Sequence, residues 1–207
     1  QNPLINPLIL FDKAVPFDLI HPDHFIPAIE YWISISKQNI QNIVANPAEP
    51  TFENVIHALE KSSERLDQVA LIFGNLEVAN GDEKIHEIGK KIYPLFASFS
   101  SDITLNPVMF LKIKSVYDNR KKLSLSAEAD RVLEKTYLSF ARNGALLSGG
   151  KKDELRKIDQ ELSTLGPQFS ENVLNATNAF ELLLDKSDLD GLPESAIEAA
   201  KELATSL

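Results

Sequence analysis

The sequence predicts an all-α protein built from antiparallel helical hairpins. Apolar residues recur at steps of three and four over long stretches, the spacing that lines one face of a helix. Proline, glycine and asparagine stand between these stretches, where helices start and stop. Of the 207 residues, 43% are hydrophobic and 25% are charged, which is ordinary for a globular protein that buries its own core.

The first three helices are expected in the amino-terminal half. The first spans about residues 23–45, and its apolar side chains recur at helical spacing. The second begins after Thr51 and ends at Asn80, before a glycine that tolerates left-handed backbone. The third covers about residues 82–105. Pro94 lies inside it and should kink or split the helix, because proline removes a backbone hydrogen bond.

The remaining helices follow the same logic. Asn106 restarts the chain before a proline, and Ser126 caps a further helix that ends near Gly144. After Gly150, apolar residues line one face of a long helix, and Pro193 opens a final short helix that ends near residue 205.

Two segments are expected to depart from this pattern. Residues 1–22 form an extended lead-in, because four prolines stand among scattered apolar residues there. Residues 179–184 are the one plausible strand, so a small β element is expected near them. The domain organisation is therefore a lead-in, residues 1–22, followed by a helical region, residues 23–207.

The most informative stretch is residues 46–60. Asn46 precedes a proline and so ends the preceding helix, since a residue before proline is pushed out of the α region. Thr51 then stands where an N-cap hydroxyl belongs, and Glu53 places negative charge in the first turn. Asn54 stands where a capping box normally has Glu or Gln, so the box is expected to be imperfect.

Four blocks of this sequence carry a resemblance to a known family. Residues 46–60 read NPAEPTFENVIHALE, residues 17–30 read FDLIHPDHFIPAIE, residues 169–177 read FSENVLNAT, and residues 189–196 read LDGLPESA. Taken in their order along the chain, they resemble blocks of the thimet oligopeptidase, oligopeptidase A and peptidyl-dipeptidase (dipeptidyl carboxypeptidase) family of zinc metallopeptidases. The 46–60 block leans towards the peptidyl-dipeptidases and the 169–177 block towards oligopeptidase A, so both branches stay open.

The resemblance implies chemistry that this chain does not carry. The family uses His-Glu-x-x-His on a helix, where two imidazoles bind zinc and the glutamate acts as general base. The only His-Glu pair here is His86-Glu87, and Lys90 occupies the position of the second histidine. We therefore assign no catalytic residue and no metal ligand to this chain. Its substrate-binding residues are not identifiable from the sequence.

The resemblance also implies a place for the chain in a larger protein. We expect it to be the amino-terminal half of a neurolysin-like helical peptidase, forming a wall of the cleft that restricts access to short peptides. Zinc would belong to the parent enzyme and not to this chain. The partner would be the missing carboxy-terminal catalytic region of the same polypeptide, and this chain alone is predicted to be inactive.

Two other functions are compatible with the residues. One is a stand-alone helical module that binds peptides or a partner without catalysis. The other is a metal site that uses His57 and Glu60, one helical turn apart, for which the alternative is a surface ion pair. His21 and His24 could chelate a metal, but two ligands make a poor site, so they are interpreted as a structural helix entry.

Composition excludes several classes of partner. The net charge is −9, whereas nucleic-acid binding needs clustered Lys and Arg. There is no cysteine, so disulfides and thiolate metal sites are excluded. No apolar run approaches the ~20 residues that span a bilayer, so no membrane partner is expected. A cytoplasmic protein is expected, with the periplasm or export as the alternative because the chain begins at Gln1 and not at Met.

Overall fold

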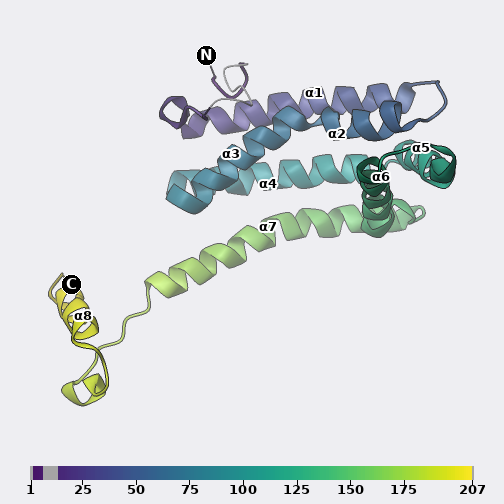
Figure 1. The fold of residues 1–207 in the computed structure, drawn as a ribbon. Helices are drawn as coiled ribbons and strands as arrows, with labels where there is room; N and C mark the ends of the chain where they lie inside the picture. The colour runs from purple at the N-terminus through teal and green to yellow at the C-terminus, as the bar shows by residue number, and fades with distance from the viewer. Residues whose placement is uncertain (1, 7–13, 207) are drawn as a thin grey trace. The chain divides into compact units, whose positions relative to one another are not determined.

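The computed structural model describes residues 2–6 and 14–206 and divides the chain into two compact units. Unit 1 is Gln1–Gln168 and unit 2 is Phe169–Leu207. Within the described residues every regular element is a helix (Figure 1), which confirms the all-α fold class. Part of the predicted lead-in, residues 7–13, lies outside the described residues.

Longer helices alternate with short helical turns along the chain. The longer ones are α1 (Phe25–Ala45), α3 (Glu64–Asn80), α4 (Glu83–Thr104), α5 (Pro107–Asn119), α6 (Ala127–Phe140), α7 (Gly150–Asn178) and α8 (Glu194–Ser206). The short ones are η1 (Phe17–Leu19), η2 (Pro22–His24), η3 (Phe52–His57), α2 (Ala58–Ser62), η4 (Arg120–Lys122), η5 (Ala141–Ala145) and η6 (Lys186–Leu189). These bounds agree closely with the helices predicted from the sequence.

The first apolar core of unit 1 lies between α3, α4 and the amino-terminal half of α1. Phe25 of α1 is fully buried, and its ring meets the ring of Phe73 edge to face at 5.1 Å between centroids. The lead-in joins this core, because Leu4 is buried in it and the Leu4 carbonyl accepts a hydrogen bond of 2.8 Å from Trp32 Nε1. The lead-in is thus fastened to α1 by both apolar and polar contacts.

The second apolar core lies between α5, α6, η3 and the carboxyl-terminal half of α1. Met109 and Ile113 of α5 and Leu133 of α6 are fully buried there. Beside them Tyr117 and Tyr137 stack at 4.0 Å between ring centroids, and the Arg120 guanidinium lies 4.0 Å from the Tyr117 ring centroid. Aromatic stacking therefore joins α5 to α6, and the cation–π contact covers the Tyr117 ring from the end of α5.

The capping box at Thr51 is complete, so the prediction of an imperfect box is wrong. Thr51 Oγ1 accepts a 3.1 Å hydrogen bond from the Asn54 backbone N–H, and Asn54 Oδ1 accepts a 2.8 Å bond from the Thr51 backbone N–H. The Asn54 side-chain amide also donates to the Glu49 carbonyl at 3.0 Å. The shorter asparagine therefore completes the box in place of the usual Glu or Gln.

Removing the Thr51 hydroxyl should destabilise the start of η3. We expect Thr51→Ala to lower the free energy of unfolding by about 1 kcal/mol, because an orphan backbone N–H loses its acceptor. The measurement is urea unfolding followed by circular dichroism. Thr51→Ser is the matched control because it keeps the hydroxyl. An equal loss in both variants would contradict the capping role.

Two positions in unit 1 have special backbone requirements, Pro94 inside α4 and Gly144 in η5, the short helix that follows α6. Helix α4 continues through Pro94, so of the two expected outcomes, a kink or a split, the split is absent. Gly144 has a φ of +97°, a left-handed conformation that L side chains rarely adopt. A Cβ at Gly144 would lie 2.4 Å from Leu155 Cδ2, so the position also lacks room.

Unit 2 holds the last turns of α7, then η6 and α8. The expected β element near residues 179–184 is wrong, because residues 180–185 have no regular secondary structure. A strand needs a neighbour that pairs its backbone groups, and the described residues offer none. None of the described side chains of unit 2 is buried. This small unit therefore has no apolar core of its own.

Candidate functional site

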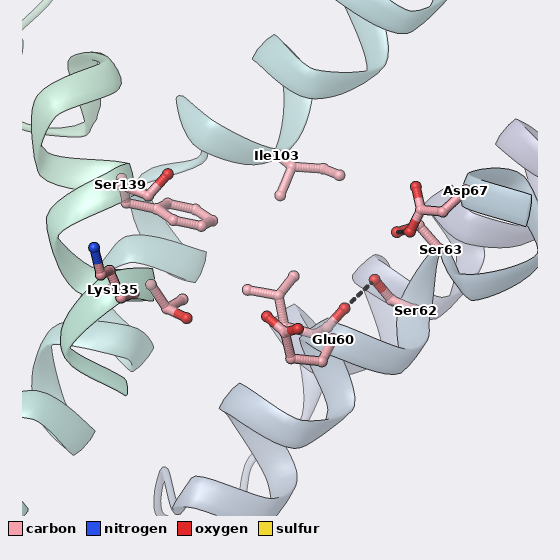
Figure 2. Close-up of a pocket in the computed structure, with 10 residues that line it drawn as sticks. Glu60, Ser62, Ser63, Asp67, Ile103, Lys135 and Ser139 are labelled. Atoms are coloured by element: carbon pink, nitrogen blue, oxygen red, sulfur yellow. Dashed lines mark hydrogen bonds between the residues drawn. The ribbon is translucent and has the colours of Figure 1, made fainter. Parts of the chain in front are cut away.

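A polar groove on unit 1 is the candidate site. Its largest hollow, about 400 Å³, lies between α2, the start of α3, the end of α4 and α6 (Figure 2). Ten residues line this hollow: Leu59, Glu60, Ser62, Ser63, Asp67, Ile103, Lys135, Thr136, Ser139 and Phe140. Two further hollows of about 310 and 370 Å³ share Ile103 and Ser139, respectively, with the first. The three hollows adjoin one another along α4 and form one groove.

Most hydroxyl groups of this groove already have partners. Ser62 Oγ donates to the Leu59 carbonyl at 2.7 Å, and Ser63 Oγ donates to Asp67 Oδ2 at 2.9 Å. Thr136 Oγ1 donates to the Val132 carbonyl at 2.9 Å. These bonds fix the walls of the groove and leave little hydroxyl chemistry for a ligand.

Two charged groups of the groove remain open. The side chains of Glu60 and Lys135 are exposed and make no ion pair with any residue that the structure describes. Figure 2 shows them on different walls of the hollow, Glu60 on the α2 side and Lys135 on α6. A carboxylate and an ammonium group placed this way can bind a ligand that carries both charges, such as a short peptide with free ends.

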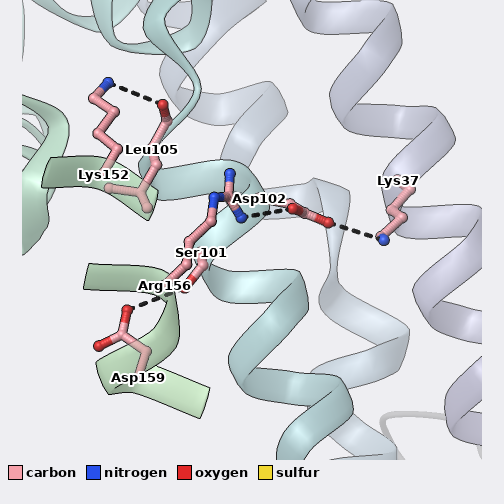
Figure 3. A network of polar contacts seen from close by, with 7 residues as sticks. All are labelled: Lys37, Ser101, Asp102, Leu105, Lys152, Arg156 and Asp159. Atoms are coloured by element: carbon pink, nitrogen blue, oxygen red, sulfur yellow. Dashed lines mark hydrogen bonds and ion pairs between the residues drawn. The ribbon is translucent and has the colours of Figure 1, made fainter. Parts of the chain in front are cut away.

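A polar network fastens the first turns of α7 to α4 (Figure 3). Asp102 is its centre: Lys37 Nζ of α1 lies 3.0 Å from Asp102 Oδ2, and Arg156 Nη1 of α7 lies 2.8 Å from Asp102 Oδ1. Ser101 Oγ donates to Asp159 Oδ2 at 3.1 Å, and Lys152 Nζ donates to the Leu105 carbonyl at 3.0 Å. One carboxylate thus links three helices of unit 1.

The network lowers the pKa of Asp102, the carboxylate at its centre. Partial burial raises the pKa of Asp102, but hydrogen bonds and charges from Lys37 and Arg156 outweigh burial, so the pKa lies below its ordinary value. A lowered pKa in the folded state means that Asp102 stabilises the fold above its unfolded-state pKa of about 3.9. This contribution is lost as the pH falls through the lower folded-state pKa.

Asp102→Asn should therefore lower the free energy of unfolding at neutral pH and make this free energy vary less with pH in the acid range. We expect a loss of up to about 1 kcal/mol, because ion pairs at partly exposed sites contribute little. The measurement is urea unfolding between pH 2 and pH 7, approximate limits that bracket an ordinary aspartate pKa. Asp18→Asn is the control, since Asp18 makes no ion pair with a described residue. An unchanged acid dependence in Asp102→Asn would contradict the assigned role.

The rings of His21 and His24 lie 5.2 Å apart between centroids, but the histidines singled out in the sequence form no metal site with the other described residues. The ring of His57 pairs with Glu53, with Nδ1 2.9 Å from Oε2, so the expected partner Glu60 is wrong. His24 Nδ1 accepts a 3.0 Å hydrogen bond from the His21 backbone N–H at the start of η2, which confirms the helix entry. Among the described residues no group of three or more His, Cys, Asp or Glu side chains could hold a metal ion.

The partial zinc motif is a surface ion pair. Lys90 Nζ lies 2.8 Å from Glu87 Oε1 on α4, and this hydrogen bond and charge lower the pKa of Glu87. The glutamate that would act as base in a zinc motif therefore has a lysine as its neighbour. His86, Glu87 and Lys90 therefore do not fit a zinc site.

Sequence comparison identifies the class of protein that this helical structure comes from. The chain is 32% identical over 206 residues to dipeptidyl carboxypeptidase of Salmonella typhimurium, and 30% identical over 205 residues to dipeptidyl carboxypeptidase of Escherichia coli. These matches cover 97% and 99% of this chain and 30% of each relative. Oligopeptidase A of Escherichia coli is 28% identical over 202 residues, with 97% of this chain and 30% of that protein covered.

These matches fit the amino-terminal region of the dipeptidyl carboxypeptidase and oligopeptidase A family, which confirms the resemblance carried by the four sequence blocks. The chain spans about 30% of the length of these relatives. No protein-family model matches the chain. In the part of the chain that the structure describes, no helix is both long and apolar enough to cross a membrane.

Proposed function

We propose that this chain forms the amino-terminal, non-catalytic region of a zinc metallopeptidase that hydrolyses short peptides. The observation that carries the proposal is the match over nearly the whole chain to two peptidases of which it covers only 30%. Zinc and the general base would come from polypeptide outside this chain. No catalytic step is assigned to its own residues, because Lys90 occupies the place of a zinc ligand.

Within this function, unit 1 would form one wall of the substrate cleft through the polar groove. A cleft that admits peptides stays filled with water between turnovers, so its wall can carry polar side chains that a buried interface would exclude. Lys135 would attract the carboxylate end of a peptide, and Glu60 its amino end or a basic side chain. The arrangement supports binding and orientation and leaves bond cleavage to the missing region.

The exposed apolar face of α7 in unit 1 favours this function over a stand-alone binding module. Ile158 and Leu165 stand seven residues apart on one face of α7 and are 46% and 55% exposed, whereas Leu162, which is 59% exposed, lines the groove. Arg156 and Lys152 of the same helix meanwhile contact α4. A self-contained module would bury its apolar face, whereas a region of a larger protein leaves that face for the rest of the molecule to cover.

The first experiment compares this chain with the longer polypeptide encoded by its natural gene. We expect the longer protein, loaded with zinc, to hydrolyse short peptides and the isolated chain to hydrolyse none. Activity is measured with fluorogenic peptides, and zinc with elemental analysis of both proteins. Hydrolysis by the isolated chain, or a gene that encodes no zinc motif, would overturn the proposal.

The second experiment tests the groove in the longer protein. Glu60→Gln and Lys135→Gln should raise KM for charged short peptides up to about five-fold and leave kcat unchanged, as expected for lost binding worth up to about 1 kcal/mol. Glu49→Gln and Lys121→Gln remove exposed charges outside the groove and serve as matched controls. An unchanged KM in both groove variants would show that the groove does not face the substrate.

A further inference from the structure

Unit 2 exposes an unusual amount of apolar surface. Large apolar side chains that are more than two-fifths exposed stand throughout it: Phe169, Val173, Leu174, Phe180, Leu182, Leu183, Leu184 and Leu192. Leu183 is 91% exposed and Phe180 is 72% exposed. Single exposed apolar residues are normal on a protein surface, but a run of this density marks an interaction surface.

This unit cannot be stabilised by its own contacts. It comprises residues 169–207, and chains of about 40 residues bury too little surface to fold without a disulfide, a metal or a partner. The sequence has no cysteine, and the described residues hold no group of metal ligands. A partner is the remaining source of stability.

We propose that unit 2 is a docking segment whose leucine-rich surface packs against an apolar, basic-rimmed patch on the part of the peptidase that lies outside this chain. This inference rests on the proposed function. Its interaction core is Phe180, Leu182, Leu183 and Leu184, which lie in residues 180–185 without regular structure. Their side chains become covered only when the partner is present.

The charges around this core specify the chemistry of the partner. Acidic residues stand before and after the leucines: Glu181, Asp185, Asp188, Asp190 and Glu194. An acidic rim is complemented by Lys and Arg on the opposite surface, which steers association and rejects partners of the same charge. Two copies of unit 2 would bring two acidic rims together, so a second copy of this chain is the less favourable occupant.

The length of the relatives identifies where such a partner is found. About 70% of each dipeptidyl carboxypeptidase lies outside the region that this chain matches. A partner on the same polypeptide acts at an effective concentration in the millimolar range, so even a modest apolar contact is formed. A separate protein would need a higher affinity to cover the same fraction of these surfaces, because it lacks this effective concentration.

The test uses hydrogen exchange on the longer polypeptide and on the isolated chain. Backbone amides of residues 169–206 should exchange at least about ten-fold more slowly in the longer protein, because docking removes the locally open state. Leu183→Ser and Leu182→Ser in the longer protein should restore fast exchange in this segment. Leu71→Ser is the control, since Leu71 is 67% exposed on α3 and lies outside unit 2.

The outcomes separate this inference from the proposed function. A longer protein that hydrolyses peptides while residues 169–206 exchange as fast as in the isolated chain would overturn the docking inference alone. A protected segment in a protein without peptidase activity would support docking and count against the proposed function. Sedimentation that shows a dimer of the isolated chain, abolished by Leu183→Ser, would assign the surface to a second copy and overturn the inference.

Discussion

Phe25→Ala is expected to lower the free energy of unfolding of unit 1 by about 3–5 kcal/mol, the range for truncating a buried phenylalanine. Phe25 is fully buried at the start of α1 and meets Phe73 of α3 edge to face. Its removal would take away the apolar contacts of the ring and leave a cavity between two helices that cannot close without moving their backbones.

The measurement can report on unit 1 alone. Trp32 is the only tryptophan of the chain and lies half-buried on α1, so its fluorescence during urea unfolding follows this unit. Phe17→Ala is the matched control because Phe17 is 48% exposed, and it should cost less than about 0.5 kcal/mol. Equal losses in the two variants would contradict the assigned core.

Gly144→Ala should destabilise unit 1 by about 2–3 kcal/mol. Part of this cost is backbone strain, since a side chain at φ +97° is unfavourable by about 1–2 kcal/mol. The rest is steric, because the new Cβ would lie 2.4 Å from Leu155 Cδ2 and 3.0 Å from Leu105 Cδ2. The leucine ends can rotate away, but only by disturbing the contact of α7 with the end of α4.

Gly149→Ala separates the two contributions. Gly149 also has a positive φ, +50°, but no atom lies within 4 Å of the position that an added Cβ would occupy. Gly149→Ala should therefore lower the free energy of unfolding only by the cost of backbone strain, about 1 kcal/mol. Urea unfolding of both variants, followed by Trp32 fluorescence, gives the steric contribution as their difference. A Gly149 variant as unstable as the Gly144 variant would show that space at Gly144 is not limiting.

The helices were predictable because their start signals are local. Thr51, Asp82, Asn106 and Ser126 each accept a hydrogen bond from a backbone N–H two or three residues ahead, as capping residues do. Such a signal needs no knowledge of distant residues. The all-α fold class follows from these caps together with apolar spacing.

The wrong predictions depended on distant contacts or on fine geometry. Residues 179–184 have strand-like composition, but a strand forms only where a neighbour pairs with it. The prediction for Pro94 left a kink or a split open, and α4 continues through it as one helix with Ile92 and Phe99 buried on either side. His57 has carboxylates on both sides along the helix, and the sequence alone did not distinguish Glu53 from Glu60.

The groove was not predictable from spacing. Glu60 is on α2, Ile103 on α4 and Lys135 on α6, so residues far apart in the sequence form one hollow only after the helices have packed. Glu60 was singled out for its spacing to His57, which proved irrelevant to the groove. Lys135 had no local signal at all, because a lysine on a polar helix face is the commonest arrangement.

Helix α1 contributes to both apolar cores, with Phe25 and Ile29 in the first and Ile40 and Ile43 in the second. Because the two cores share α1, unfolding of one core destabilises the other. Fraying α1 at either end exposes side chains of one core and removes support from the half of the helix that serves the other core. Heating should therefore produce a single cooperative transition for unit 1. A destabilising substitution at Met109 should lower the unfolding temperature that Trp32 fluorescence reports.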